Sequence, residues 1–413
     1  MSELFRVVVL SDIHAGEVGH GDTFVITEPP SSRANENPLR DLIGFAERHS
    51  IRADLLLCPG DLGNRAHPAG RVYGWGTLQE LASAFGTNSV VATVGNHDVE
   101  TRTPSVDQAQ LLKSLAPRYP VSEATQASKY WSDGFYIDDT DPRYRILNID
   151  TCADFPPHPG AGATPDQVRA HELFVERGAV SLDRIAAIET ALAPLSEKPV
   201  NIALMHHHPV EHARHDLLKD TYGPVVNGEK LIGALELASN CGRWMLVHGH
   251  KHIPNFTIDG GSAYSPMVLC AASVGGHLWQ PIAAIARNQF HVIEWEIDRQ
   301  VGLPITRGRV QSWAWSFGKG WTEAPPTTGL PAEFGFGAIE DPRDLADQVV
   351  STLIASGSEF ERWRDIRESF PALRYLGPRD FELFEDRLDS ADFLLERNRA
   401  FGVTMIARRA LWT

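Results

Sequence analysis

The chain has 413 residues, of which 43% are hydrophobic and 22% are charged, and its formal net charge at pH 7 is −15. This composition is typical of a globular protein and excludes a largely disordered chain. The length favours one large domain with an appended region. Because the negative charge repels nucleic-acid phosphates, the sequence disfavours binding to duplex nucleic acid.

The four cysteines, Cys58, Cys152, Cys241 and Cys270, are far apart and include no C-x-x-C pair. This spacing fits neither a disulfide framework nor a zinc knuckle, so we expect buried free thiols. The first apolar strand begins by about Val7, which leaves no room for a signal peptide, and no stretch is long enough to span a membrane. We therefore expect a cytoplasmic protein with no membrane partner.

The first apolar run, Val7-Val8-Val9-Leu10, has no polar alternation and predicts a strand buried on both faces. It ends in Asp12 and His14, which point the same way in an extended chain. The ends of parallel strands are where α/β sheets place ligand sites. The polar segment 15–37 then forms either a wall of the substrate pocket or a surface insertion.

Two further units repeat this pattern of an apolar strand followed by a glycine turn and a polar side chain. A helix over 38–48 leads to the strand 54–59 and then to Asp61 and Asn64, and a helix over 77–85 leads to the strand 89–94 and then to Asn96, His97 and Asp98. Such βαβ alternation predicts parallel strands, so all three turns should lie on one edge of the sheet.

The order is looser over 101–178, which we interpret as a cap-like insertion. It is expected to contain a short helix (106–115), a hairpin (129–138), a strand (144–150) and a loop rich in proline and glycine (155–165). Regular elements return with a helix over 182–192 and with strands over 200–205 and 244–247. These strands end in His206-His207-His208-Pro209 and His248-Gly249-His250-Lys251-His252.

The remaining apolar runs, 267–273, 290–297 and 308–316, are expected to form a second sheet. Within the last run, Trp313 and Trp315 could stack bases or belong to the core. Residues 324–337 are linker-like, and 341–413 predict amphipathic helices. The expected division is a domain over 1–322 and a mainly helical region over 323–413, which could serve as an oligomerisation element, a lid, a partner-binding module or a structural buttress.

Side chains that can bind metal ions collect at the predicted strand ends: Asp12, His14, Asp61, Asn96, His97, His207, His250 and His252. Imidazole, carboxylate and amide ligands without thiolate suit zinc, iron or manganese. This number of ligands is too large for one ion and suits two ions about 3.5–4 Å apart, bridged by a carboxylate and a water.

The motifs D-x-H, G-D-x-x-D, G-N-H-D/E, H-x-P and G-H-x-H follow one another over residues 7–252, and in this order the sequence resembles the calcineurin-like metallophosphoesterases. The resemblance implies a four-layer α/β/β/α sandwich, here with a C-terminal helical extension. It also implies two sets of ligands: Asp12, His14 and His252 for one metal, Asn96, His207 and His250 for the other, with Asp61 bridging them.

His207 is chosen from the three consecutive histidines because it stands two residues before Pro209, which leaves His206, His208 and His248 outside the predicted ligand set. The resemblance implies that His97 contacts the phosphate and protonates the leaving oxygen, a suitable task for an imidazole. Asn64 stands where many relatives carry aspartate, and an amide cannot raise the basicity of His97 as a carboxylate would. Asn64 and Asp98 are expected to support the site without binding metal, Asp98 as an acceptor in the turn.

The predicted function is metal-dependent hydrolysis of a phosphodiester, either nucleotide-like or small, by in-line attack of a metal-bridging hydroxide. A phosphomonoesterase or a single-strand nuclease of the same fold remains an alternative. A non-catalytic scaffold is an alternative of another class. It predicts lost ligands, and none is lost here.

Overall fold

A computed structural model describes residues 3–17, 22–27, 33–103, 107, 109–212, 223–258, 262–297, 306–398 and 402–411. Parts of the 15–37 segment and the start of the helix expected over 106–115 lie outside these residues. The described part of that helix is α3 (Gln110–Lys113). None of the described helices is both long and apolar enough to cross a membrane.

The first sheet has seven strands in the order β12-β11-β10-β1-β2-β3, and β13 pairs with β11 off this path. β1, β2 and β3 are parallel neighbours, whereas β10 runs antiparallel to β1, with Val8 opposite Val292. The strands are β1 (Glu3–Val9), β2 (Leu55–Cys58), β3 (Val90–Ala92), β10 (Asn288–Ile297), β11 (Gly308–Ser316), β12 (Gly320–Glu323) and β13 (Glu333–Phe336).

The second sheet has six strands in the order β4-β5-β6-β7-β9-β8. Its four central strands are parallel, and its edge strands β4 and β8 are antiparallel to their neighbours. The strands are β4 (Phe135–Asp138), β5 (Tyr144–Ile149), β6 (Val200–Leu204), β7 (Trp244–His248), β8 (Asn255–Ile258) and β9 (Met267–Cys270).

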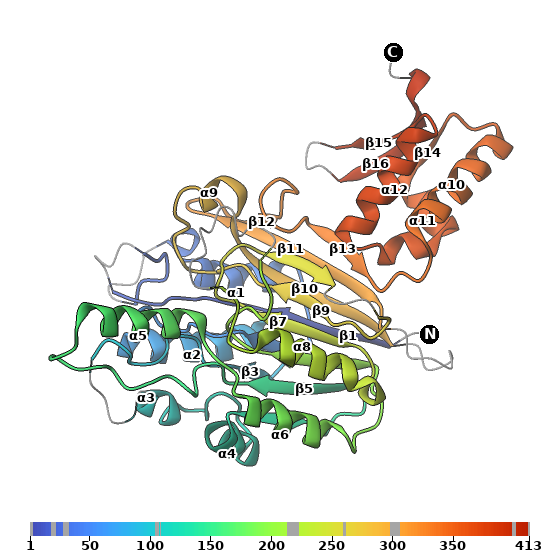
Figure 1. The fold of residues 1–413 in the computed structure, drawn as a ribbon. Coiled ribbons are helices and arrows are strands. Elements are labelled where there is room, and N and C mark those ends of the chain that lie inside the picture. Colours follow the sequence, from blue (N-terminus) through green and yellow to red (C-terminus); the bar gives the residue numbers. More distant parts are fainter. Residues whose placement is uncertain are drawn as a thin grey trace.

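The two sheets pack face to face between helices, which gives the expected four-layer α/β/β/α sandwich (Figure 1). One apolar core joins the inner faces of both sheets with α1 (Pro38–Arg48) and α2 (Pro68–Ala84). A second core lies between the outer face of the second sheet and the helices α6 (Leu182–Leu192) and α8 (Gly228–Leu237). Smaller elements are η1 (Ala34–Glu36), α4 (Ala124–Asp133), α5 (Pro165–Arg177), η2 (Ser239–Cys241) and α9 (Ile282–Ile285).

The structure corrects two predictions about strands. The hairpin expected over 129–138 is the end of helix α4 followed by β4, which pairs with β5, so the 101–178 segment supplies two strands of the second sheet. Of the three runs expected in that sheet, only β9 belongs to it, because β10 and β11 extend the first sheet beyond β1. Trp315 is buried, and Trp313 stacks on Phe290 with ring centroids 4.7 Å apart, so both belong to the packing of the core.

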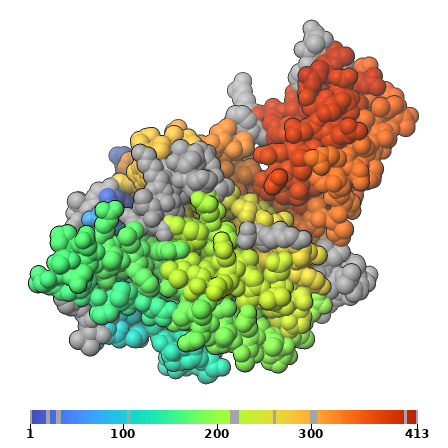
Figure 2. Space-filling view, viewed as in Figure 1, coloured from blue at the N-terminus to red at the C-terminus, as the bar shows by residue number. Residues whose placement is uncertain are grey.

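The C-terminal region forms a separate lobe with its own apolar core (Figure 2). It contains the expected helices and also a small sheet of order β14-β16-β15, which was not expected. β13 lies within the stretch expected to be a linker. The elements of the lobe are α10 (Pro342–Ser356), β14 (Phe360–Arg362), α11 (Trp363–Ser369), η3 (Pro371–Tyr375), α12 (Pro378–Ser390), β15 (Phe393–Arg397), β16 (Val403–Arg408) and η4 (Arg409–Leu411).

Candidate metal centre

The predicted ligands lie in the turns that follow β1, β2, β3, β6 and β7. Five of these residues have left-handed backbone conformations, with φ between 51° and 74°: Asp12, His14, Asp61, His250 and His252. Outside glycine such conformations cost roughly 1–3 kcal/mol each and collect at functional sites, where the surrounding structure enforces them. Buried strands thus hold the turns in conformations that direct polar side chains toward one point.

A first group of candidate ligands contains Asp12, His14 and His252, whose ligand atoms all lie within 4.8 Å of one another. His14 Nε2 is 3.0 Å from His252 Nε2, and Asp12 Oδ1 is 3.2 Å from His252 Nε2. Burial, followed by the charge of His252, lowers the pKa of His14 to about 3. The imidazole of His14 is therefore neutral at pH 7, as metal ligation requires.

Asp61 lies between this group and a second one. Its Oδ2 atom is 3.6 Å from His14 Nε2 on one side and 3.5 Å from His206 Nε2 on the other. Burial raises the pKa of Asp61, and the nearby carboxylates of Asp12 and Asp98 raise it further. A buried carboxylate among other carboxylates needs compensating positive charge, which metal cations would supply.

The second group involves His206, which the sequence interpretation left outside the ligand set. His206 Nδ1 donates to the Pro59 carbonyl oxygen at 2.7 Å, so in the neutral ring Nε2 is an acceptor. That Nε2 is 3.0 Å from Asn96 Oδ1, which is also an acceptor. Asn96 Nδ2 is one of several buried side-chain atoms that have no hydrogen-bond partner within the described chain. Two acceptors that face each other fit a cation between them.

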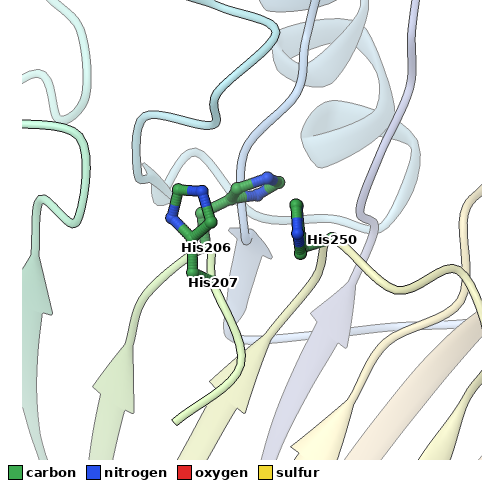
Figure 3. A group of neighbouring side chains, drawn as sticks. All are labelled: His206, His207 and His250. Carbon is green, nitrogen blue, oxygen red and sulfur yellow. The ribbon is translucent and has the colours of Figure 1, made fainter. Parts of the chain in front are cut away.

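His207, which the H-x-P spacing had selected, contacts protein groups through both ring nitrogens. Its Nε2 donates to the Val175 carbonyl oxygen at 3.2 Å, and its Nδ1 lies 2.7 Å from Thr151 Oγ1. The rings of His206, His207 and His250 lie close together (Figure 3), and their ligand atoms are within 4.8 Å of one another. His206 thus lies beside Asp61, whereas His207, which the H-x-P spacing predicts as a ligand, belongs to the candidate group with His206 and His250.

His97 lies beside the two groups. Its backbone N–H donates to Asp61 Oδ1 at 2.8 Å, and its ring centroid is 4.8 Å from that of His14. The backbone N–H of Arg65 donates to His97 Nδ1 at 3.3 Å, so the proton of the neutral ring is on Nε2. Burial lowers the pKa of His97. The neutral ring can thus donate a hydrogen bond from Nε2.

Asn64 and Asp98 occupy different positions around these turns. Asp98 accepts from the backbone N–H of Gly63 at 3.0 Å and from that of Gly95 at 3.1 Å, so it ties the turns after β2 and β3 together. Asn64 is buried, and within the described chain its Nδ2 atom has no partner. The hydrogen-bond donor to His97 Nδ1 is the backbone N–H of Arg65 and not the side chain of Asn64. The sequence did not predict this contact.

The donor set fits two metal ions. It combines neutral imidazole, carboxylate and amide oxygen in two neighbouring groups that share Asp61, and no thiol takes part. Three consecutive histidines follow β6, so the choice of a ligand among them depends on the conformation of this turn.

A family model for calcineurin-like phosphoesterases matches residues 5–254, and a model for a calcineurin-associated winged helix-turn-helix (wHTH) domain matches residues 334–390. Among solved structures, the chain is similar to a dimetal phosphatase from Danio rerio, with 13% identity, coverage of 77% of this chain and 98% of that one, and a TM-score of 0.48. It is also similar to the purple acid phosphatase PPD1 from yellow lupin, with 13% identity and a TM-score of 0.49. The match covers 82% of this chain and 54% of that one, so this chain spans about half of the lupin protein. None of the curated proteins compared with the chain matches it.

Proposed function

The chain belongs to the calcineurin-like phosphoesterase family, and from this premise we propose that it is a dinuclear metal-dependent phosphodiesterase acting on a nucleotide-like or other small diester. The observation that carries the proposal is the place of Asp61, whose Oδ2 lies 3.6 Å from His14 Nε2 and 3.5 Å from His206 Nε2. One carboxylate oxygen midway between two groups of ligands is the arrangement that a two-metal site needs.

The proposed ligands follow from this geometry. Asp12, His14 and His252 would hold one ion, and Asn96, His206 and His250 would hold the other, with Asp61 shared. His207 would support the site through Thr151 and the Val175 carbonyl group instead of binding metal. When bound, two ions of manganese, iron or zinc supply an activated water and polarise the phosphoryl oxygens.

The protein's own part in the reaction is orientation and hydrogen bonding to the leaving group. Asp12 accepts from the backbone N–H of His250 at 3.1 Å, which fixes the turn after β7 relative to the turn after β1. His97, held by Asp61 and by the Arg65 backbone, would donate a hydrogen bond from Nε2 to the leaving oxygen of the ester. Proton transfer to the leaving oxygen would need the imidazolium form of His97, and Asn64 supplies no carboxylate that would favour this form.

The test is hydrolysis of bis(4-nitrophenyl) phosphate and of 4-nitrophenyl phosphate with added manganese, with metal content measured on the same samples. We expect two metals per chain and faster turnover of the diester. Asn96→Ala should lower turnover at least about 100-fold, the scale of loss when a metal ligand or its support is removed. Asn88→Ala, at an exposed asparagine, is the matched control and should keep full turnover.

The other readings give different outcomes. Turnover of the monoester alone would replace the proposal with a phosphatase. Two bound metals without turnover of either ester would favour the scaffold, which the complete set of ligands argues against. The four cysteines are free and buried, which supports the additional proposal that the protein works in a reducing compartment such as the cytoplasm.

A further inference from the structure

A group of aromatic side chains lies on the surface in contact with one another. The ring centroid of Phe24 is 3.9 Å from that of His277 and 6.0 Å from that of Phe317. Beneath them, the buried Trp315 contacts both phenylalanines, at 4.9 Å and 6.2 Å. Phe317 is 59% exposed and His277 is also exposed. We call Phe24, His277 and Phe317 the aromatic patch; the core supports it from below while its outer side is open.

The aromatic patch adjoins the metal centre through Gly276, the residue before His277. A Cβ atom at Gly276 would lie 3.3 Å from His14 Cδ2 and 3.4 Å from His252 Cε1, so Gly276 lies next to two proposed ligands. The turn is fixed, because Gly276 N–H donates to Ser273 Oγ at 2.8 Å and Asn288 Nδ2 donates to the Gly276 carbonyl oxygen at 2.8 Å.

A second connection runs from the aromatic patch to His97. The backbone N–H of His277 donates to the Asp22 carbonyl oxygen at 2.8 Å, and the Asp22 carboxylate pairs with the Arg65 guanidinium at 2.8 Å. The backbone of Arg65 in turn contacts His97 Nδ1. His97, the exposed Arg65 and the aromatic patch are therefore neighbours along one rim of the metal centre.

We propose that the aromatic patch stacks against the nucleobase of the substrate, which makes the substrate a nucleotide ester; this inference rests on the proposed phosphodiesterase function. A nucleotide carries its base one sugar ring away from its phosphate, and a base is uncharged, so the acidic protein does not repel it. Every base presents a π face to such rings, whereas an aliphatic alcohol does not.

The experiment measures the dissociation constants of adenosine monophosphate and ribose 5-phosphate for the manganese-loaded full-length protein by isothermal titration calorimetry. We expect the wild type to bind the nucleotide roughly 10-fold more tightly, toward the low end of what base stacking on aromatic side chains provides. The double variant Phe24→Leu/Phe317→Leu keeps apolar side chains but removes two rings, and it should bind both ligands equally within about 3-fold. Phe360→Leu, at a phenylalanine 57% exposed on the C-terminal lobe, is the matched control and should keep the preference.

Equal binding of the two ligands by the wild type, or an unchanged preference in the double variant, would overturn the inference. If the double variant does not fold, Phe317→Leu alone is measured, because that ring is mostly exposed, and its nucleotide preference should fall at least about 3-fold. Diester hydrolysis is assayed in parallel. Hydrolysis without nucleotide preference would reject only this inference, whereas nucleotide preference without hydrolysis of any ester would reject only the proposed function.

Discussion

At the scale of single residues, His206 and His207 are neighbours with opposite surroundings. The Pro59 carbonyl group takes the Nδ1 proton of His206 and leaves Nε2 as an acceptor beside Asn96 and Asp61. We therefore expect His206→Ala to lower the metal content from two ions to about one per chain and turnover about 100-fold or more. His207→Ala should keep two ions, because both nitrogens of His207 contact protein groups. Elemental analysis of the two variants checks this, and a loss of metal from the His207 variant alone would restore the H-x-P assignment.

Asp150 offers a test of stability against pH. It is 4% exposed, and burial raises its pKa to about 7, only partly offset by the Cys152 backbone N–H and Arg184. An unfolded aspartate has a pKa of about 3.9, so the folded state binds the proton more tightly than the unfolded state does. The contribution of Asp150 to the free energy of unfolding therefore falls as the pH rises from about 4 to about 7. Asp150→Asn keeps an acceptor for Cys152 N–H but cannot ionise.

We expect Asp150→Asn to raise the free energy of unfolding at pH 8 by roughly 1–3 kcal/mol, and by much less at pH 5. Urea denaturation at the two pH values measures both differences. Asp133→Asn, at an exposed aspartate, is the control and should show no such dependence on pH. A stabilisation of equal size at both pH values would mean that ionisation of Asp150 is not its cause.

Much of the centre could be predicted from residue order alone. Asp12, His14, Asp61, Asn96, His250 and His252 all follow buried strands, and the structure brings them together. The choice between His206 and His207 could not be predicted in the same way. It depends on which side chain the turn after β6 directs toward Asp61, and this turn is set by contacts with Pro59, Thr151 and Val175 from distant parts of the chain.

At the scale of elements, the apolar pattern of the sequence predicts where strands lie, but it does not reliably predict the sheet to which each strand belongs. The helices α1 and α6 begin and end where periodicity and flanking residues predict. The sequence pattern predicts β10 and β11 as strands. However, a buried apolar run has no local feature that identifies the strand with which it pairs. Their place beside β1 follows from pairings such as Val8 with Val292, 284 positions apart, which only the complete fold determines.

Helix α1 gives a prediction at this scale. Its N-cap, Asn37, is buried and accepts from the backbone N–H groups of Leu39 and Arg40 at 3.1 Å and 3.3 Å. We expect Asn37→Ala to lower the free energy of unfolding by about 1–2 kcal/mol, because two helix N–H groups lose their acceptor. Asn37→Ser should recover most of that loss, since serine caps about as well as asparagine. Urea denaturation of the three proteins measures the order, and an alanine variant as stable as the wild type would contradict it.

At the scale of the whole molecule, residues 334–390 of the C-terminal lobe match a model for a calcineurin-associated winged helix-turn-helix domain, but the charge of helix α12 does not suit nucleic acid. Helix α12, which precedes the strands β15 and β16, carries five carboxylates and two arginines over Pro378–Ser390. A helix of this charge is repelled by duplex phosphates, as is the chain as a whole. The charge of α12 therefore does not favour contact of this helix with duplex nucleic acid.

The two domains are joined at β13 and η3. Gly335 N–H donates to the Leu376 carbonyl oxygen at 2.9 Å, Tyr375 Oη donates to Glu296 at 2.6 Å, and Arg367 pairs with Glu333 at 2.9 Å. β13 pairs with β11 and so completes the first sheet, whereas the lobe beyond it has an apolar core of its own. We therefore expect the boundary between the two folding units to follow β13.

A truncation pair tests this boundary. A chain ending at Glu323 loses β13 and leaves the outer edge of β11 unpaired over Gly308–Gln311, so we expect insoluble protein or a large fall in melting temperature. A chain ending at Gly337 keeps β13 and loses mainly the polar contacts of Tyr375 and Arg367. Contacts of this kind contribute roughly 1 kcal/mol each, so this chain should stay soluble and hydrolyse the diester within about 3-fold of the full chain. Soluble yield, melting temperature and turnover distinguish the two; if both truncations were insoluble, the lobe would be a required buttress of the phosphoesterase domain.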